Sequence, residues 1–218
     1  PPMVRIPNLN PRERQAESDF IEAYESNPRR MALQYREAVL AETKEGYPPE
    51  FNTDDAKSMT SHWSHPGLSI EERSINRATL NTALHQTANA VAKRAFVEHL
   101  DTLEEGDQVM ITVGGVGSGK GHALKNVDRA IKLKKQSKAV WDSAGDQNAT
   151  ENPWVQKELE KRGLKGVYVY VHADPKNSWA NPAFGVVKRA GDPNDGRMVD
   201  AQVFADSYSI GAKNHQSF

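Results

Sequence analysis

A run of closely spaced glycines, GGVGSGKG at residues 114–121, directly follows the strand-forming segment VMITV. A stretch that favours a helix comes next, so the order is strand, glycine loop, helix. The run fits the G-x-x-x-x-G-K part of the Walker A pattern, in which backbone N–H groups converge on phosphate oxygens and side chains would block the approach. An accidental glycine turn is the alternative, and the flanking strand and helix argue against it. The sequence therefore predicts a nucleotide-binding loop.

The lysine of this loop, Lys120, is expected to reach the β and γ phosphates of ATP. Gly121 departs from the pattern, because it stands where a serine or threonine hydroxyl normally ligates Mg²⁺. We expect Mg²⁺ to be held by the phosphates, by water and by another side chain such as Asp142; weak or absent activity is the alternative. His122 is either a nucleotide contact or a solvated helix residue. The residues expected to contact the nucleotide are Gly114, Gly115, Val116, Gly117, Ser118, Gly119, Lys120, Gly121 and His122.

The composition limits the kinds of site that the chain can build. Its 218 residues include no cysteine, which excludes disulfides, thiolate metal sites and a cysteine nucleophile. The 28 basic and 29 acidic residues give a net charge of −1, so no global field favours nucleic acid or an anionic membrane. No run approaches the roughly 18 apolar residues of a membrane span, and the start lacks a secretory-signal pattern. We expect a cytoplasmic protein that binds neither nucleic acid nor membranes.

Turn residues and hydrophobic periodicity divide the chain into a helical leader, residues 1–49, and a core, residues 50–218. The leader is either a surface arm or a functional element. Residues 51–72 are polar and predict a long loop. Strands are expected at 109–113, 138–141 and 166–173, and helices at 13–24, 28–43, 75–100, 122–134, 153–162 and 200–208. Strands alternating with helices predict an α/β fold, P-loop NTPase-like, with a mostly parallel sheet flanked by helices and an N-terminal helical extension.

Six segments occur in an order that resembles the zeta toxin family of P-loop kinases. They are FNTDDAK, LHQTANAVAKRAF, VMITVGGVGSGKG, AVWDSAGDQN, KGVYVYVHADPKNSW and VVKRAGDPNDGRMVD. The resemblance covers about residues 50–209 and is closest to a subgroup whose acidic motif precedes the glycine loop. It implies an ATP- and Mg²⁺-dependent kinase that phosphorylates a hydroxyl of a small molecule such as UDP-N-acetylglucosamine or NAD. An antitoxin or immunity protein is the partner that it implies.

In this resemblance Asp54 stands at the position of the catalytic aspartate, Asn52 at that of the first carboxylate and Lys57 at that of an arginine. Phosphoryl transfer to a hydroxyl needs a carboxylate that orients the attacking oxygen and takes its proton, and Asp55 could share this task with Asp54. The alternative is that NTDD only caps a helix, because Asn, Thr and Asp favour such positions. His85, in HQTAN, matches the helix before the loop and is expected to bind substrate.

The segment WDSAGDQN resembles the family's substrate-holding segment, in which Asp142 matches a glutamate and Gln147 is expected beside the substrate. Asp142 also follows the strand KAVW, and open α/β sheets bind ligands at the carboxyl ends of their strands; a solvated turn is the alternative. Arg189 and Arg197 resemble two arginines that neutralise charge on the transferred phosphate, which this chemistry requires. Solvated loop arginines are the alternative there. Departures from the family pattern in WDSAGDQN leave the acceptor open.

Two other interpretations stay open. A catalytically degenerate nucleotide-binding module fits Gly121 and the altered substrate segment. A structural or effector segment of a larger phage or toxin protein fits the leader and the long helix at 75–100. The sequence stops soon after its last recognisable element, so we expect it to be part of a longer polypeptide. The remaining histidines lack the spacing of a zinc site.

Overall fold

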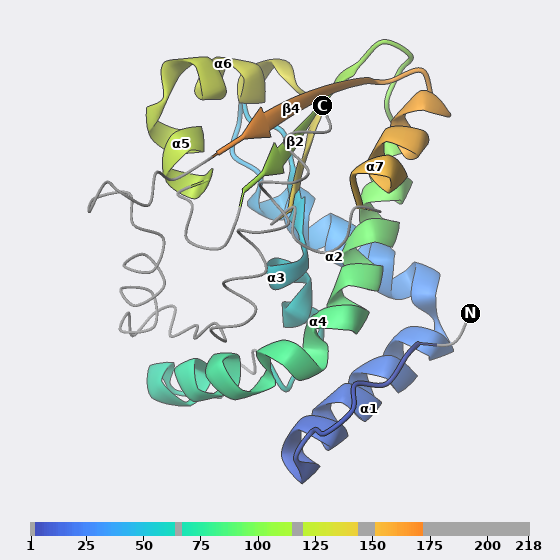
Figure 1. The fold of residues 1–218 in the computed structure, drawn as a ribbon, viewed down its shortest axis with the longest axis vertical. Coiled ribbons are helices and arrows are strands. Elements are labelled where there is room, and N and C mark those ends of the chain that lie inside the picture. The colour runs from blue at the N-terminus through green and yellow to red at the C-terminus, as the bar shows by residue number, and fades with distance from the viewer. Residues whose placement is uncertain (1–2, 64–66, 115–119, 144–150, 172–218) are drawn as a thin grey trace.

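The chain folds around a parallel β-sheet with the strand order β1-β3-β2-β4 (Figure 1). The computed structural model describes residues 3–63, 67–114, 120–143 and 151–171. The strands in these ranges are β1 (Glu50–Asn52), β2 (Gln108–Val113), β3 (Ala139–Asp142) and β4 (Lys165–Tyr170). Every neighbouring pair of strands is parallel. The expected α/β class, a parallel sheet flanked by helices, is confirmed, and the arrangement is consistent with a P-loop NTPase-like fold.

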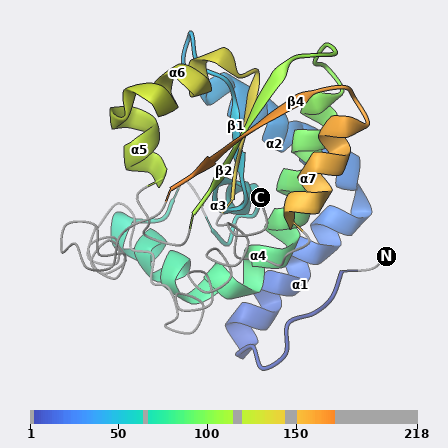
Figure 2. The ribbon, with the colours of Figure 1, turned by 45° about the horizontal axis from the view of Figure 1, so that its top comes forward.

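Helices cover both faces of the sheet (Figures 1 and 2). They are α1 (Pro11–Ser26), α2 (Pro28–Glu42), α3 (Thr53–Ala56), α4 (Ile70–Leu100), α5 (Lys120–Asn126), α6 (Asp128–Gln136) and α7 (Glu151–Glu160). Side chains of the strands alternate between the faces: Ile111 and Trp141 join the larger core with α4, whereas Met110 and Val140 join Leu124 of α5 in a smaller one. Burial on both faces explains why the central strands are almost wholly apolar.

The two connections around β2 run over opposite faces of the sheet. Helices α5 and α6 link β2 to β3 and lie over the smaller core, and α7 links β3 to β4 on the side of the larger core. Because crossovers between parallel strands are right-handed, a change in the direction of strand progression forces this change of face. In open α/β sheets such a reversal marks the ligand site, at the carboxyl ends of the strands. The topology thus directs attention to the end of β2.

The N-terminal leader is packed into the main core, so it is not a surface arm. Helices α1 and α2 lie within two or three residues of their expected bounds, and both begin with an asparagine cap followed by proline. Phe20 of α1 and Tyr35 of α2 are almost completely buried and belong to the same cluster as Phe51 and Phe96. In both ribbon views α1 lies along α4 (Figures 1 and 2). The leader therefore contributes directly to the packing of the core.

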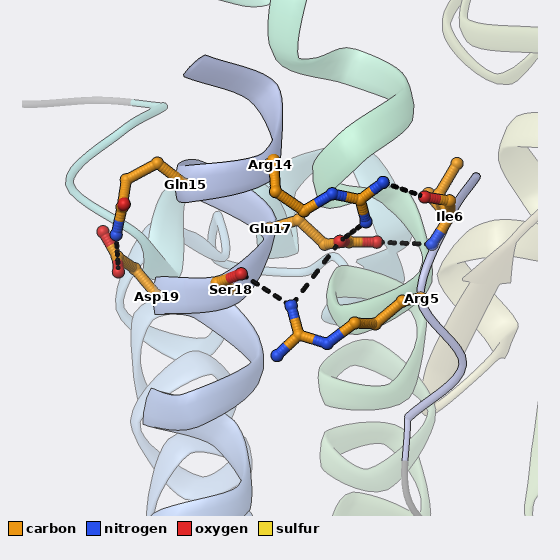
Figure 3. A network of polar contacts seen from close by, with 7 residues as sticks. All are labelled: Arg5, Ile6, Arg14, Gln15, Glu17, Ser18 and Asp19. Carbon is orange, nitrogen blue, oxygen red and sulfur yellow. Dashed lines mark hydrogen bonds and ion pairs between the residues drawn. The ribbon is translucent and has the colours of Figure 1, made fainter. Parts of the chain in front are cut away.

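A polar network ties the first residues of the chain to α1 (Figure 3). Its centre is Glu17, which is 2% exposed and accepts hydrogen bonds of 2.6 Å from the Ile6 N–H and from Arg14. Arg14 also donates to the Ile6 carbonyl, and Arg5 donates to Ser18 while lying 3.9 Å from Glu17. A buried carboxylate needs such partners, because removing it from water without them is costly. The network explains an acidic residue on the core face of α1.

The prediction of a long loop at 51–72 is wrong, because this segment contains most of β1, the helix α3, a 3₁₀ turn at Lys57–Met59 and the start of α4. A three-residue strand has no periodicity of its own and forms only through pairing with β3. Helix α4 begins five residues before its expected start. Ser69 and Glu72 form a capping box there, with the Ser69 N–H donating to Glu72 at 2.8 Å and the Glu72 N–H donating to Ser69 at 3.1 Å.

The single helix expected at 122–134 is two helices, α5 and α6, which meet at Val127. This residue has the extended backbone angles φ −103° and ψ 112°, and the Asn126 amide donates to the His122 carbonyl at 2.9 Å. The bend allows Leu124 and Ala130 to pack into the same small core. The expected strands at 109–113, 138–141 and 166–173 correspond to β2, β3 and β4, and α7 matches the helix expected at 153–162. The helix expected at 200–208 lies outside the described residues.

None of the described helices combines the length and the apolar character that crossing a membrane requires.

Replacing Glu17 with alanine should lower the free energy of unfolding by about 2 kcal/mol, because Arg14 and the Ile6 N–H lose their acceptor. This is less than the ~3–5 kcal/mol of a fully buried pair, since Arg14 is 36% exposed. Urea denaturation followed by tryptophan fluorescence measures the change. The control is Glu22→Ala, at an exposed position of the same helix, which should change the unfolding free energy little. Equal losses in the two variants would contradict a role for the network.

Candidate functional site

The candidate site lies at the carboxyl edge of the sheet, where the chain leaves each strand for a functional segment. Asn52 of β1 pairs in register with Asp142 of β3, which in turn pairs with Thr112 of β2. These three polar residues form a row across the end of an otherwise apolar sheet. The glycine loop leaves β2 two residues beyond Thr112, and α3 begins directly after Asn52. The row is therefore shared by the segments that the sequence linked to phosphate binding and to catalysis.

Both ends of the predicted phosphate loop are described. Gly114 is buried directly after β2, and Lys120 is the first residue of α5. The Lys120 ammonium group donates a hydrogen bond of 2.6 Å to the Gly114 carbonyl, so the lysine folds back over the start of its own loop. Gly121 is exposed, and a Cβ built on it would meet no atom within 4 Å. Crowding therefore does not explain the missing hydroxyl at this position.

Five of the residues expected to contact the nucleotide, 115–119, lie outside the described residues, as do Gln147, Arg189 and Arg197. The expectations for them stay predictions. His122 is exposed on α5, and its ring lies 3.2 Å from the Asn126 amide within the same helix.

Asp142, at the end of β3, has a carboxyl group with a shifted pKa. Burial raises the pKa of Asp142, and the nearby charges of Glu50 and Asp54 raise it further, whereas Lys120 and a hydrogen bond from the Thr112 hydroxyl act in the opposite direction. The net effect is a pKa of Asp142 above its ordinary value. The charges of Lys120 and Asp54 both affect the pKa of Asp142. The three residues predicted for the site are therefore near one another in the fold.

The residues around Asp142 could hold Mg²⁺ only if phosphate oxygens of a ligand supplied further bonds to the ion. Among the residues that the structure describes, no three histidine or acidic side chains cluster in the manner of a metal site. Mg²⁺ normally keeps several waters and takes one or two carboxylates plus substrate phosphates, rather than a cage made wholly of protein. Asp142 supplies one carboxylate oxygen, and Thr112 holds that carboxylate through its hydroxyl. This donor set suits a cation that arrives bound to ATP.

The acidic motif NTDD forms the start of α3, and the N-cap interpretation is confirmed for Asn52. The Asn52 side chain accepts a hydrogen bond of 2.8 Å from the Asp55 N–H, and its amide group donates to the Asp55 carboxylate at 2.6 Å. Asp55 thus takes part in capping the helix, and its predicted substrate contact is untested. Asp54 is in the same first turn, where a carboxylate is favoured by the helix end. The motif therefore caps α3 and also places Asp54 in its first turn.

A buried lysine holds Asp54. The Lys57 ammonium group is completely buried, donates to the Asp54 carboxylate at 2.7 Å and also donates to the Asn81 side chain of α4. It lies 5.1 Å from the centre of the Trp63 ring, a cation–π contact. Asp54 remains 44% exposed. The carboxylate is therefore anchored to a buried lysine while part of it stays exposed.

One face of α4 is polar where it passes α3. Asn81, His85 and Asn89 are spaced by four residues, which places them on one stripe of the helix. Asn81 accepts from Lys57, and the Thr53 hydroxyl donates to Asn89 at 3.3 Å. The predicted substrate residue His85 lies between these two contacts. The positioning role of Lys57 and Asn81 was not expected from the sequence, in which the four-residue spacing of Asn81, His85 and Asn89 was the available signal.

Comparison with models of known protein families and with curated proteins finds no match to this chain.

Replacing Asp142 with asparagine should raise the melting temperature at about pH 7. The folded state raises the pKa of Asp142, so ionising this carboxyl group destabilises the folded protein. This destabilisation is absent below the unfolded-state pKa of about 3.9, and it grows as the pH rises through the folded-state pKa. Asparagine keeps the oxygen that accepts from Thr112 but carries no charge. Thermal unfolding over a pH series measures the difference between the variant and the unmodified protein, which should vanish near about pH 3.5.

The control for this series is Asp128→Asn, at an exposed position of α6. A melting temperature of Asp142→Asn below that of the unmodified protein at neutral pH would show that the carboxylate is stabilised where it lies.

Proposed function

We propose that this chain is an ATP-dependent phosphotransferase that moves the γ-phosphate to a hydroxyl group of a small molecule. One observation carries the proposal: Lys120, Asp142 and Asp54 all lie at the carboxyl edge of a parallel sheet, on segments that leave neighbouring strands, beside the two described ends of a glycine loop. A phosphate-binding lysine, a carboxylate for a divalent cation and a carboxylate for the attacking hydroxyl are the groups that phosphoryl transfer needs. Their common location supports this reaction over a purely structural role.

Lys120 is proposed to hold the β and γ phosphates. Its described hydrogen-bond partner is the Gly114 carbonyl, which carries no charge, and the carboxyl group that its charge influences is that of Asp142. A polyphosphate placed against the loop would replace the carbonyl with anionic oxygens, so that the lysine would gain an ion pair as well as a hydrogen bond. The backbone N–H groups of the loop would supply further donors.

Asp54 is proposed to act as the general base. The acceptor hydroxyl would give its proton to the Asp54 carboxylate as its oxygen forms a bond to the γ-phosphorus, while the bond from that phosphorus to the bridging oxygen breaks and ADP leaves. Lys57 and the α3 cap hold the carboxylate in place, so it needs little rearrangement when the acceptor binds. Arg189 and Arg197 remain proposed to neutralise charge on the transferred group.

Asp142 is the residue proposed to hold Mg²⁺ together with the phosphates, and the bound ion would neutralise phosphate charge. The raised pKa of Asp142 fits this assignment, because a cation beside the carboxylate would favour its ionised form.

The resemblance to zeta toxins supports a narrower version of the proposal. It favours UDP-N-acetylglucosamine or an NAD-like molecule as the acceptor, with His85, Asp55 and Gln147 near it, a cytoplasmic site of action, and an antitoxin or immunity protein as the partner. The polar stripe of α4 beside α3 suits a hydroxyl-rich acceptor, because amide side chains can both donate and accept hydrogen bonds.

A second candidate function is nucleotide binding without transfer. Gly121 favours it, since the hydroxyl that normally ligates Mg²⁺ is absent although the position has room for one. The two functions make the same prediction for ATP binding and opposite predictions for turnover.

Replacing Lys120 with alanine should weaken ATP binding at least about tenfold, equivalent to about 1.4 kcal/mol, because the phosphates lose their cation. Isothermal titration calorimetry with ATP and Mg²⁺ measures the dissociation constant. The matched control is Lys125→Ala, an exposed lysine on the same helix, which should bind ATP like the unmodified protein. Equal affinities for the two variants would remove the glycine loop from the proposal.

Replacing Asp54 with asparagine should lower kcat by about 10²–10⁴-fold with little change in the KM for ATP, since the variant keeps an oxygen for Lys57 but cannot take the proton. Phosphate transfer from radiolabelled ATP to UDP-N-acetylglucosamine, NAD and water, with Mg²⁺ present, gives the rates. Asp128→Asn serves as the control. A protein that binds ATP but transfers no phosphate, with or without Asp54, would support the binding module instead.

A further inference from the structure

Tyr35 of α2 connects the N-terminal helices to the candidate site. From its contacts we infer that Tyr35 is a positioning residue, which holds the start of α3 and thereby sets the position of Asp54; the inference rests on the proposed role of Asp54 as the base. Nothing in the glycine loop or the acidic motif suggested a contribution from residues 1–49.

The Tyr35 hydroxyl bonds to both backbone groups of one residue. It donates to the Asn52 carbonyl at 2.8 Å and accepts from the Asn52 N–H at 3.3 Å. Tyr35 is 2% exposed, and its ring packs edge-on against Phe51 with the ring centres 6.3 Å apart. Burial raises the pKa of Tyr35 far above its usual range, so the hydroxyl keeps its proton and can donate at every pH at which the protein would be assayed.

Asn52 is the point at which this contact matters most. It is the last residue of β1, an edge strand of the described sheet, and in a parallel ladder the N–H and C=O of one residue point to the same side. Backbone groups on the outer side of an edge strand need partners when they are buried, and Tyr35 supplies both from a single oxygen. The same residue caps α3 with its side chain.

Helix α3 depends on such external contacts because it is short. Four residues form too few internal hydrogen bonds to be stable alone. Its C-terminal side is held by Lys57, which bonds Asp54 and Asn81, and its N-terminal side is held by Tyr35 through Asn52. Asp54 lies between these two anchors. A displacement of the base by about 1 Å is enough to slow a positioned reaction by about 100-fold.

The decisive variant is Tyr35→Phe in the full chain, because it removes one oxygen and keeps the ring that packs on Phe51. We expect kcat for phosphate transfer from ATP, with Mg²⁺ present and water or UDP-N-acetylglucosamine as the acceptor, to fall at least about tenfold. The KM for ATP and the calorimetric affinity for a non-hydrolysable ATP analogue should stay within about twofold, since the glycine loop is untouched. Amide hydrogen exchange should accelerate in the peptide containing α3.

The matched control is Tyr24→Phe, the same change at a partly buried tyrosine of α1 that packs against the same core. It should leave transfer, affinity and the exchange of α3 as in the unmodified protein. Equal kcat values for the two variants overturn the inference, and so does a loss in Tyr35→Phe that matches its loss of folded protein in a thermal scan.

Failure of the proposed function has a different signature. An unmodified protein that transfers no phosphate to any of these acceptors removes the catalytic role of Asp54. The exchange measurement still decides whether Tyr35 restrains α3: faster exchange in Tyr35→Phe alone supports the restraint, and unchanged exchange overturns it.

Discussion

The structure depends on the burial of α4 against the sheet. Phe96 of this helix contacts Trp141 of β3 with ring centres 5.1 Å apart and Phe51 of β1 at 5.7 Å, in tilted and edge-on arrangements that suit aromatic pairs. Helices α1 and α2 pack on the same helix, so the leader, the long helix and the strands β1, β2 and β3 share one core. The middle of α4 carries the polar stripe of Asn81, His85 and Asn89 beside α3. The packing of α4 on the sheet thus sets the position of the core and of the polar stripe beside the candidate site.

Two lysine–aspartate pairs at the carboxyl edge, Lys57 with Asp54 and Lys120 with Asp142, differ in how their charged groups are held. Lys57 and Asp54 bond to each other, and the buried lysine is further stabilised by Asn81 and Trp63. A completely buried ammonium group would be expensive without these partners, so the pair is a fixed structural element that presents one carboxylate to solvent. Lys120 and Asp142 instead influence each other from neighbouring elements, with Lys120 bonded to a neutral carbonyl. The first pair is set by the fold, and the second is suited to change when a phosphate and a cation bind.

The parts of the fold that were predicted from the sequence are those with a signal of their own. The strand VMITV, the periodic helix that became α4 and the proline-started helices α1 and α2 all have local patterns, and each was found within a few residues. The strand β1 was missed and the helix α3 was expected only in the alternative in which NTDD caps a helix, because these elements are three and four residues long and depend on contacts with their neighbours. The expected helix at 122–134 did not allow for the extended backbone of Val127, a single residue between two helix-forming stretches.

The candidate site shows the same division between residue identity and residue geometry. The sequence named Asp54, Lys120 and Asp142, because a base, a phosphate ligand and a strand-end carboxylate have recognisable chemistry and spacing. It did not indicate Tyr35, whose contribution is a hydroxyl bonded to the backbone of a residue 17 positions later. Any residue can present its backbone to such a bond, so the partner leaves no trace in the sequence. For the same reason a short helix that carries a reactive side chain must take its position from distant segments, and in this chain those segments include the leader.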